Sequence, residues 1–527
     1  MSVSTQAASL DEDKASLETP HRGLLMMAVM SVSVIQFLDV TIANVALPHM
    51  QSSLGASLDT ISWVLTSYII AGVMMTPVAG WLSDRIGSRR LFLVAVAGFL
   101  LASMLCGAAT SLMQMVFFRA IQGTCTAFIA PMSQTIMFDI NPPSKQPAAM
   151  TLWGLVVMIA PIAGPMIGGV LTESLNWRWI FYVNLPIGIP TLMILAWLLP
   201  SRPKVRRKLD MSGFLLLALG LGCLQLMMDR GQSKDWFDSW EIIIELLVAL
   251  SVFWVFLIHT LDTKVTLFPG ALMRNPNFLG ALAFMFILGV ANVAIAAVLP
   301  IMYQNVYNFS VLDTGLLMAP RGVGVIVTMM ITNRLMGRVD VRHLITCGYL
   351  VASLALWTMS NWSLDMDRGP IVVSSFVQGL GLGFVFMPMN MIAFATLEPQ
   401  YRPDGSSLLN LMRNIGGSFG ISIIVTMLSR NTQTGHADMA ANITSYNLSG
   451  IDPATTADRF GEYGTVFLQL IDAEINRQAL MIAYIDNFHA MALFILCVAP
   501  VALLLKPLQL PFGVKPLPSE REMLSSH

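Results

Sequence analysis

The sequence predicts an all-α integral membrane protein with fourteen membrane-spanning helices. Of its 527 residues, 55% are hydrophobic and only 12% are charged, about half the charged share that is usual in soluble proteins. A spanning helix needs roughly 20 mostly apolar residues, so fourteen spans would take about 280 residues, which the chain can supply. The first apolar run is too long for a signal peptide, and we expect it to remain as the first span.

The apolar runs and the loops between them set the expected topology. We expect spans near residues 24–46, 61–82, 91–110, 113–138, 148–171, 180–200, 212–228, 241–260, 278–302, 314–333, 344–360, 370–396, 408–429 and 490–506. Loops rich in Lys and Arg alternate with poorer loops, and the rich loops mark the cytoplasmic side. Both termini fall on that side, which agrees with an even number of spans.

We expect two six-helix halves with two additional spans between them. A weak internal repeat supports this plan, because Gln122-Gly123 in the fourth span is matched by Gln378-Gly379 in the twelfth. Repeated halves around a central site are a common transporter plan. The predicted units are a cytoplasmic tail (1–20), a first half (21–200), a linker with spans seven and eight (201–275), a second half (276–510) and a second cytoplasmic tail (511–527).

The second half is expected to include a long extracytoplasmic loop over residues 430–489, rich in Asn, Thr, Ala and Asp. Its later part, 467–483, has apolar residues at helical spacing. This segment either lies along the membrane surface or forms one packed helix within a solvated loop.

Asp39 lies inside the first predicted span, where an acid costs roughly 2.5–3.5 kcal/mol and needs a use or a partner. Burial and a nearby cation act in opposite directions on a carboxyl group, so an acid held between them can load and release a proton. Arg119, in the fourth span, is the natural partner, because a helical rise of 1.5 Å places both residues roughly 10 Å below the outer surface. The alternative is an ion pair that only locks two helices together.

Composition and motifs argue against several other classes of protein. The net charge of −1 disfavours a nucleic-acid partner. The five cysteines are scattered singly, without the spacing of a metal site. We find no phosphate-binding Gly-x-x-x-x-Gly-Lys loop and no nucleophile–base constellation. We therefore expect no enzyme activity, metal or other cofactor, and a proton gradient as the energy source.

The loop after the second span reads Gly80-Trp81-Leu82-Ser83-Asp84-Arg85-Ile86-Gly87-Ser88-Arg89-Arg90. It resembles the G-x-L-x-D-R-x-G-R-[RK] loop of the major facilitator superfamily, with Ser88 in place of the first basic residue. In that superfamily the loop latches the cytoplasmic gate, with its arginine near an acid low in span four, which would be Asp139 here. Simple anchoring of the loop at the cytoplasmic surface would explain the arginines but not the glycines or Asp84.

Three further stretches are similar to the fourteen-span drug:proton antiporters of the EmrB/QacA type. They are residues 38–48 in the first span, Gly164-Pro165-Met166-Ile167-Gly168-Gly169 in the fifth, and residues 176–188 at the turn into the sixth. Gly164 and Gly168 would let helices approach closely, and Pro161 and Pro165 would bend the span. The resemblance implies a tight contact between the halves that opposes proton leak, although ordinary packing explains the glycines alone about as well.

Residues 119–123 fit the superfamily's R-x-x-Q-G motif, whose arginine is linked to proton transfer, and residues 228–237 look like the outer loop of the EmrB branch. This resemblance implies a multi-pass protein of the bacterial inner membrane that exports small lipophilic molecules against protons by alternating access. It also implies a periplasmic adaptor protein and an outer-membrane channel as partners.

Polar residues in or beside the predicted spans are candidates for lining the central cavity: Gln36, Asn44, Gln134, Asn292, Tyr303, Arg321, Asn390 and Arg413. Arg413 is expected close to the cytoplasmic end of its span, where it could snorkel, and Arg321 deeper. Either could attract an anionic substrate or have a structural role. The other acids considered lie near span ends, so coupling through Asp39 alone is the simplest expectation.

Two alternative functions stay open. An exporter of one dedicated metabolite, such as a fatty acid or a siderophore, would fit an anionic substrate near Arg321. A receptor or membrane scaffold without turnover would have no need for a titrating Asp39.

Overall fold

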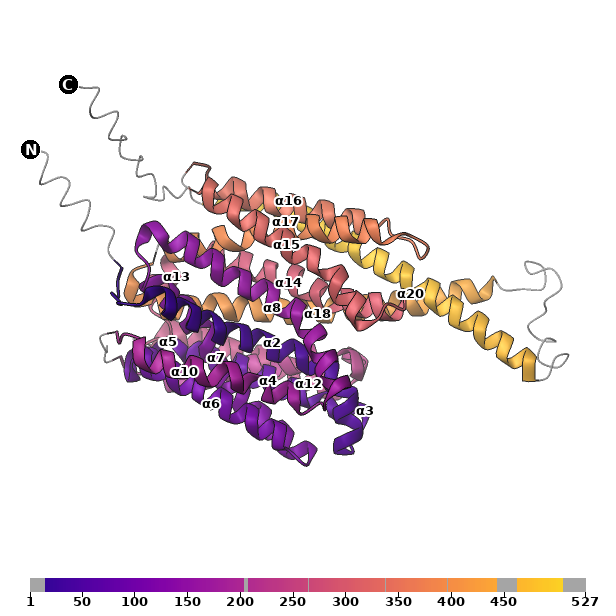
Figure 1. Cartoon of the computed structure of the whole chain (residues 1–527), viewed down its shortest axis with the longest axis horizontal. Coiled ribbons are helices and arrows are strands. Elements are labelled where there is room, and N and C mark those ends of the chain that lie inside the picture. Colours follow the sequence, from indigo (N-terminus) through magenta and orange to yellow (C-terminus); the bar gives the residue numbers. More distant parts are fainter. Residues whose placement is uncertain are drawn as a thin grey trace, which may run out of the picture.

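The computed structural model describes residues 15–202, 207–263, 265–336, 338–395, 397–442 and 462–505. All regular elements in these ranges are helices (Figure 1). Within the described residues, 13 helices are long and apolar enough to cross a membrane, and the bent α8 brings the number to as many as 14. The all-α membrane prediction is confirmed. The predicted tail 511–527 and most of the tail 1–20 lie outside the described residues.

The first half of the molecule contains six long helical units. They are α2 (Arg22–Leu54), α4 (Trp63–Met75) continuing through η1 (Thr76–Val78) into α5 (Ala79–Ile86), α6 (Ser88–Ala108), α7 (Leu112–Asp139), α8 (Gln146–Ser174), and α9 (Trp179–Tyr182) with α10 (Asn184–Leu198). The short α3 (Leu58–Ile61) and η2 (Pro143–Lys145) lie between them. Helix α2 runs past Pro48 and ends at Gly55, whose φ of 62° an L side chain rarely adopts.

The second half repeats this plan after two additional spans. Those spans are α11 (Met211–Arg230) and α12 (Trp240–Asp262), separated by η3 (Gln232–Lys234) and η4 (Trp236–Asp238). The second half comprises α13 (Gly270–Arg274), α14 (Pro276–Asn305), α15 (Val311–Leu335), α16 (Val341–Met359), α17 (Arg368–Ala395), η5 (Pro399–Tyr401), α18 (Arg402–Ala441), α20 (Glu462–Val498) and η6 (Ala499–Leu504).

Two equivalent glycine contacts reveal the relationship between the halves. In the first half Gly123 on α7 lies so close to α4 that an added Cβ would stand 2.2 Å from the carbonyl oxygen of Tyr68. In the second half Gly379 on α17 approaches α15 in the same way, with 2.0 Å to the carbonyl oxygen of Arg321. Small residues allow such close packing of membrane helices. The Gln-Gly repeat in the sequence therefore corresponds to the same helix contact made twice.

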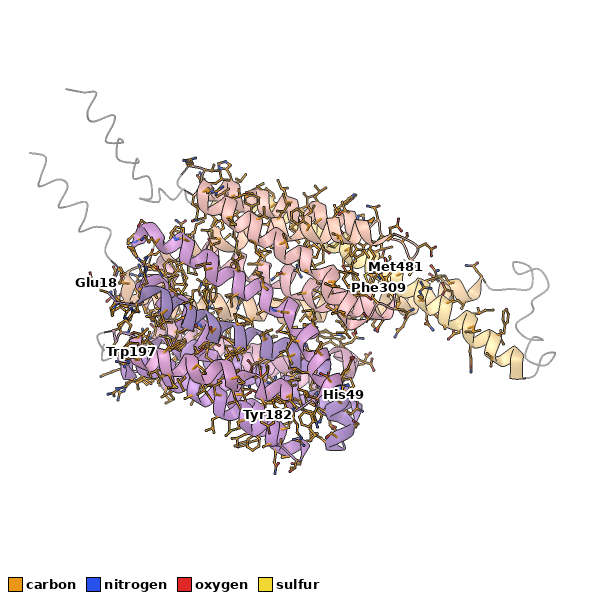
Figure 2. All side chains as sticks on the ribbon, viewed as in Figure 1. Glu18, His49, Tyr182, Trp197, Phe309 and Met481 are labelled. Atoms are coloured by element: carbon orange, nitrogen blue, oxygen red, sulfur yellow. The ribbon has the colours of Figure 1, made fainter. Side chains whose placement is uncertain are left out.

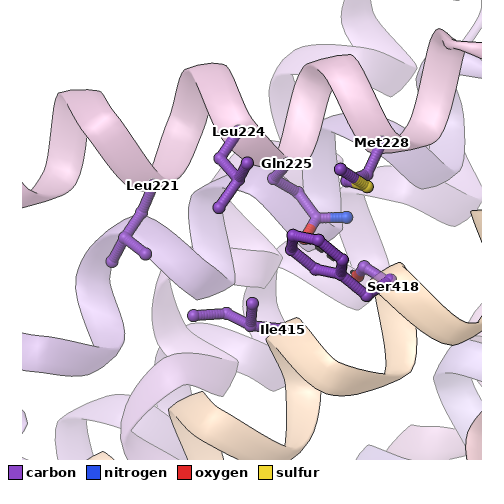
Figure 3. Close-up of a pocket in the computed structure, with 7 residues that line it drawn as sticks. Leu221, Leu224, Gln225, Met228, Ile415 and Ser418 are labelled. Atoms are coloured by element: carbon purple, nitrogen blue, oxygen red, sulfur yellow. Dashed lines mark hydrogen bonds between the residues drawn. The ribbon is translucent and has the colours of Figure 1, made fainter. Parts of the chain in front are cut away.

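The additional spans cover the seam between the halves on one side. Helix α11 packs against α4 of the first half and also contacts α18 of the second. Figure 3 shows the α11–α18 contact, where the Ser418 hydroxyl donates to Gln225 Oε1 over 2.9 Å. Nearby, the Trp236 indole donates to Thr426 Oγ1 over 2.9 Å. The surrounding pocket is too narrow to admit a water molecule.

The expected loop 430–489 is wrong over much of its length, because both of its ends are helical. Helix α18 continues to Ala441, and α20 begins at Glu462 and runs without a break into the last span. The two arms pair through His436 and Asp472, whose Nε2 and Oδ1 lie 2.9 Å apart. Residues 443–461 lie outside the described part of the chain. Segment 467–483 is helical, as its spacing predicts, but it is part of the long α20 rather than a separate helix within a loop.

The paired arms extend past the rest of the bundle. Figure 2 shows Phe309 and Met481 near the outer end of the second half, with α20 continuing beyond them. At 1.5 Å per residue, the segment 462–480 projects roughly 28 Å further. The apolar residues of this hairpin recur at helical spacing. Polar side chains of the two arms pair with each other instead of facing lipid.

Candidate proton and substrate site

Asp39 and Arg119 form a fully buried ion pair between α2 and α7. Arg119 Nη1 lies 2.7 Å from Asp39 Oδ2, and the two side chains are 1% and 0% exposed. Ion pairs at membrane depth form because an uncompensated charge there is costly. The structure therefore brings together the two residues that the sequence analysis paired by depth.

Two amides hold the other carboxylate oxygen of Asp39. Gln122 Nε2 and Asn184 Nδ2 each donate to Asp39 Oδ1 over 3.0 Å. Gln122 also accepts from Arg119 Nη1 over 2.8 Å, and Asn184 donates to Ser103 Oγ over 2.9 Å. The sequence analysis did not assign a role to Asn184, although an amide inside the sixth predicted span was a signal for one.

Aromatic rings and a backbone carbonyl enclose Arg119. Its guanidinium carbon lies 4.3 Å from the centre of the Tyr68 ring and 5.6 Å from that of Phe181. Its Nε donates to the carbonyl oxygen of Val64 over 3.2 Å. Contact with ring faces stabilises a desolvated cation. Arg119 can therefore stay charged if the carboxylate beside it becomes neutral.

A second polar cluster joins the two halves, between the Asp39–Arg119 pair and the gate motif. Gln134 on α7 donates to Asn390 Oδ1 on α17. Its Oε1 accepts from Ser406 Oγ over 2.7 Å and from Asn410 Nδ2 over 3.0 Å, both on α18. Arg413 Nη2 donates to Asn410 Oδ1 over 3.1 Å. Three predicted lining residues, Gln134, Asn390 and Arg413, thus meet here.

The central space is closed in this structure. Gln134, Trp153, Met285, Phe386, Asn390, Leu409, Asn410 and Arg413 line a gap that is too narrow to admit water. A substrate can therefore enter only if the halves separate.

Arg321 and Asn292 form a pair within the second half. Arg321 is 3% exposed, and its Nη2 donates to Asn292 Oδ1 over 2.6 Å and to the Asn292 carbonyl oxygen over 3.3 Å. The Asn292 amide in turn faces Met158 Sδ of α8 at 3.7 Å. This pair therefore lies where the second half approaches the first.

The remaining lining candidates lie apart from this centre. Gln36 is buried, with Nε2 3.5 Å from the Thr126 carbonyl oxygen. Asn44 is exposed on α2. Tyr303 is buried in the second half, where its ring lies 6.2 Å from that of Trp362. Polarity within a predicted span did not distinguish the side of the helix that faces the centre.

The cytoplasmic gate motif meets the second half through Asp404 and Arg207. Arg207 Nη1 lies 2.7 Å from Asp404 Oδ2 and 3.6 Å from Asp84 Oδ2, so one guanidinium bridges both halves. Asp404 in turn packs directly against Gly80. Arg207 lies in the linker between two spans, and its partial burial acts to lower the pKa of the guanidinium. The hydrogen bond to Asp404 and the negative charges of Asp404 and Asp84 act the other way and together are stronger. The pKa of Arg207 is therefore raised above its ordinary value.

The arginines of the gate motif do not contact Asp139. Arg85 lies 5.9 Å from the Trp81 ring centre, Arg89 donates to the Ala196 carbonyl oxygen, and Arg90 is exposed. Gly87, with φ 98°, forms the sharp link between α5 and α6.

Asp139 instead pairs with arginines from outside the motif. Arg202, in the linker after α10, contacts Asp139 Oδ2, and Arg402 Nη1 at the start of α18 lies 3.2 Å from Asp139 Oδ1. The expected partner was therefore wrong. The physical reason is that the closed halves bring the start of α18 to the end of α7 and turn the loop arginines outward.

The antiporter motif lies mostly within the first half. An added Cβ at Gly164 would stand 1.9 Å from Thr41 Oγ1, and one at Gly168 would stand 3.2 Å from the Ile42 carbonyl oxygen. Both glycines thus pack against α2 just after Asp39. Gly169 and Met166 face α15 of the other half: an added Cβ at Gly169 would stand 3.0 Å from Val311, and one at Gly315 would stand 3.4 Å from Met166 Cβ. The motif therefore lies where α8 packs against the second half, and its other glycines position the helix that carries Asp39.

Helix α8 also bends at this motif. Its segments Pro143–Pro161 and Ala163–Ser174 meet at 43°. Pro161 and Pro165 lie inside the helix, where proline removes a backbone donor and kinks the helix. The bend agrees with the expected effect of the prolines.

Two buried acids, Asp404 and Glu245, were not singled out as candidates from the sequence; they are 1% and 9% exposed. A third acid, Asp229, lies exposed near the end of α11 and accepts from Thr66 on α4. Each lies near the end of an apolar run, where sequence alone does not distinguish a solvated acid from one covered by a neighbouring helix.

Two helical halves around buried charges form the arrangement of a membrane transporter. The family description "Major Facilitator Superfamily" matches residues 29–421, and the chain belongs to this superfamily. It is 32% identical over 510 residues to the multidrug export protein EmrB of Escherichia coli (strain K12), covering 95% of this chain and 98% of the relative. It is 32% identical over 483 residues to the fatty acid resistance protein FarB of Neisseria gonorrhoeae, covering 90% and 94%.

The fold is also similar to that of a solved structure. The human organic anion transporter MFSD10 (TETRAN) matches with a TM-score of 0.55 at 12% identity, over 90% of this chain and 100% of that chain. At this identity the similarity describes the fold alone.

Proposed function

We propose that this protein is a multidrug efflux transporter that exports small lipophilic molecules in exchange for protons. The observation that carries the proposal is the buried Asp39–Arg119 pair in the first half. The similarity to the multidrug export protein EmrB supports the export function. Acids inside a membrane bundle commonly mark proton pathways in transporters, and Asp39 is such an acid.

The proposed coupling begins when the central site faces outward. A proton binds Asp39 and neutralises the carboxylate, which weakens its attraction to Arg119. Gln122 and Asn184 can follow the change by rotating their amides, because each can donate or accept. One charge crossing the membrane potential supplies about 2.3 kcal/mol per 100 mV, and the pH gradient adds to it. Release of the proton to the cytoplasm restores the pair for the next cycle.

The cytoplasmic closure is proposed to be the gate of this cycle. Arg207 between Asp84 and Asp404, and Arg402 on Asp139, must separate before the site can face inward. Partly buried pairs can hold a closed state without preventing its opening, because separation returns the charges to water. The same side is proposed to be cytoplasmic, with both termini on it, in the bacterial inner membrane.

We also propose a periplasmic adaptor protein and an outer-membrane channel as partners. The resemblance of residues 228–237 to the EmrB branch supports them. The α18–α20 hairpin would offer such an adaptor a surface beyond the lipid.

Export of one dedicated metabolite is the second candidate function. It is favoured by buried Arg321 and Arg413, which have no carboxylate partner among the described residues. The name of the relative FarB refers to fatty acid resistance, in keeping with an anionic substrate.

The proposal is tested by transport in liposomes that carry an imposed pH gradient. The panel contains a lipophilic cation, a neutral drug and a fatty acid. Uptake of several chemical types that stops on adding an uncoupler is the expected result. Transport of a single type would favour the dedicated exporter, and transport that survives the uncoupler would contradict proton coupling. Absence of all transport, with binding retained, would favour a receptor.

A further inference from the structure

Arg413 lies well inside a helix. Helix α18 begins at Arg402, so Arg413 is three turns, about 17 Å, from its start. The polar residues between Arg402 and Arg413 are helical and buried as well. The side chain is 7% exposed, and a hydrocarbon core is about 30 Å thick.

The charge of Arg413 is not balanced by an acid. Within the described ranges no carboxylate lies within ion-pair distance of it, whereas Arg119 has Asp39 and Arg207 has Asp404. Its hydrogen bond there is the one from Nη2 to Asn410 Oδ1. Taking a charge out of water costs several kcal/mol unless a counter-charge compensates it. A buried arginine without a counter-charge is suited to bind an anionic group of a ligand.

The surroundings of Arg413 are polar on one side and apolar on the other. Its guanidinium carbon lies 5.4 Å from the centre of the Phe37 ring, which belongs to the first half. Amides of Gln134 and Asn410 lie on the polar side, and Trp153 and Phe386 form part of the apolar wall. The two rings stack with their centres 6.1 Å apart. Residues from both halves thus meet around a single unpaired cation.

We propose that Arg413 binds the anionic head group of an amphipathic substrate when the halves separate, while its apolar part packs against Trp153 and Phe386. This inference rests on the proposed export function and names one class of its substrates, the carboxylate-bearing amphiphiles. The planar guanidinium suits a carboxylate because two parallel N–H donors match its two oxygens. Either fork of the guanidinium, Nε with Nη2 or Nη1 with Nη2, offers such a pair, because the bond to Asn410 uses one of the two N–H groups of Nη2.

Arg321 is the weaker candidate for the same role. Its Nη2 is already held by both oxygens of Asn292, and its other contacts lie within the second half. Arg413, by contrast, faces the opposite half through Phe37. Both arginines lie where the halves approach each other, but Arg413 has one acceptor among the described residues, Asn410 Oδ1, and so has more donors left for a ligand.

The test measures binding to the purified full-length protein in phosphatidylcholine nanodiscs, whose lipid carries no net charge. Three probes share one alkyl chain: dodecanoate, dodecyltrimethylammonium and dodecanol. Charged hydrogen bonds contribute about 1.5–3 kcal/mol, so Arg413→Gln should weaken dodecanoate binding by about tenfold to a hundredfold. Binding of the other two probes should change less than about twofold by the same scale. Arg413→Lys should recover part of the loss.

Arg430→Gln is the matched control, because Arg430 lies on the same helix but is exposed. Its dodecanoate affinity should equal that of the wild type. A thermal shift separates binding from folding: without ligand Arg413→Gln should unfold at the same or a higher temperature, since it removes an unbalanced buried charge. Dodecanoate should then stabilise the wild type and not the variant.

Two results would overturn the inference. One is dodecanoate binding that is unchanged in Arg413→Gln, and the other is equal loss of all three probes. Export of the cation and the neutral drug by a wild type that does not bind dodecanoate would reject this inference alone. Failure to transport any of the compounds in liposomes would instead reject the proposed export function.

Discussion

The carboxylate of Asp404 lies over Gly80 so closely that an added Cβ on the glycine would stand 1.9 Å from Asp404 Oδ1 and 2.8 Å from the Asp404 backbone nitrogen. The contact joins α5 of the first half to α18 of the second. Since backbone as well as side chain meets the glycine, the clash could not be relieved by a rotamer change alone. The first position of the gate motif is therefore the point at which the halves touch.

Gly80→Ala should consequently hold the cytoplasmic side open. Overpacking costs about 1–3 kcal/mol, so export should fall about tenfold or more, with access from the cytoplasm increased. Distances between spin labels on α5 and α18 measure the opening. Gly23→Ala is the control, because nothing lies within 4 Å of its added Cβ. An unchanged distance distribution in Gly80→Ala would count against the closure described here.

Asp39→Asn should abolish uphill export while leaving substrate binding within about twofold of the wild type. The amide keeps the size of the side chain but cannot carry a proton between the two sides. Gradient-driven transport and equilibrium binding, measured on one preparation, separate the two effects. Asp39→Glu retains the acid and should retain part of the transport. Full pH-driven export by Asp39→Asn would show that another group couples the protons.

Arg119→Gln should destabilise the protein by about 3–5 kcal/mol, because it leaves the Asp39 charge buried and unpaired. The double variant Asp39→Asn/Arg119→Gln removes both charges and should recover most of that loss without recovering transport. Denaturation in detergent of the two single variants and the double variant gives the coupling energy. Additive single effects would mean that the pair seen here does not persist in solution.

Gly164→Ala should disturb the helix that carries Asp39. Its added Cβ would stand 1.9 Å from Thr41 Oγ1 and 2.8 Å from Thr41 Cβ, and overpacking of this kind costs about 1–3 kcal/mol. Gly435→Ala lies outside the motif and makes a milder contact, with 3.6 Å to Ala479 Cβ, and serves as the comparison. We expect proton leak in liposomes to rise, or coupled transport to fall, in the first variant only. Equal proton leak and equal coupled transport in the two variants would show that the motif has no special role.

The proposed orientation predicts opposite labelling of two exposed positions. In a background without cysteines, Asp438→Cys on the hairpin should react with an impermeant maleimide added to cells with a permeabilised outer membrane. Arg338→Cys, in the turn between α15 and α16, should react only in inverted membrane vesicles. Both residues are exposed in the structure, so accessibility does not limit the reaction. The reverse pattern would invert the assignment of sides.

The sequence by itself determined the number and type of spans, since apolar runs of this length in lipid must satisfy their backbone hydrogen bonds within a helix. It also determined the pairing of Asp39 with Arg119, because two isolated charges at one depth have few alternatives. The Gln-Gly repeat, too, was visible as a pattern before its packing was known.

Only the tertiary structure decided which side chains share a contact across the halves. Asp139 is held by Arg202 and Arg402 rather than by the gate motif, and α18 and α20 continue as a hairpin where a loop was expected. Hydropathy records how apolar a segment is, but not which neighbour covers its polar residues. Asp404 is covered by α5 and Arg413 faces α2, and both helices are far away in the chain. The tertiary packing, rather than the local sequence, therefore determines which partners these two charges have.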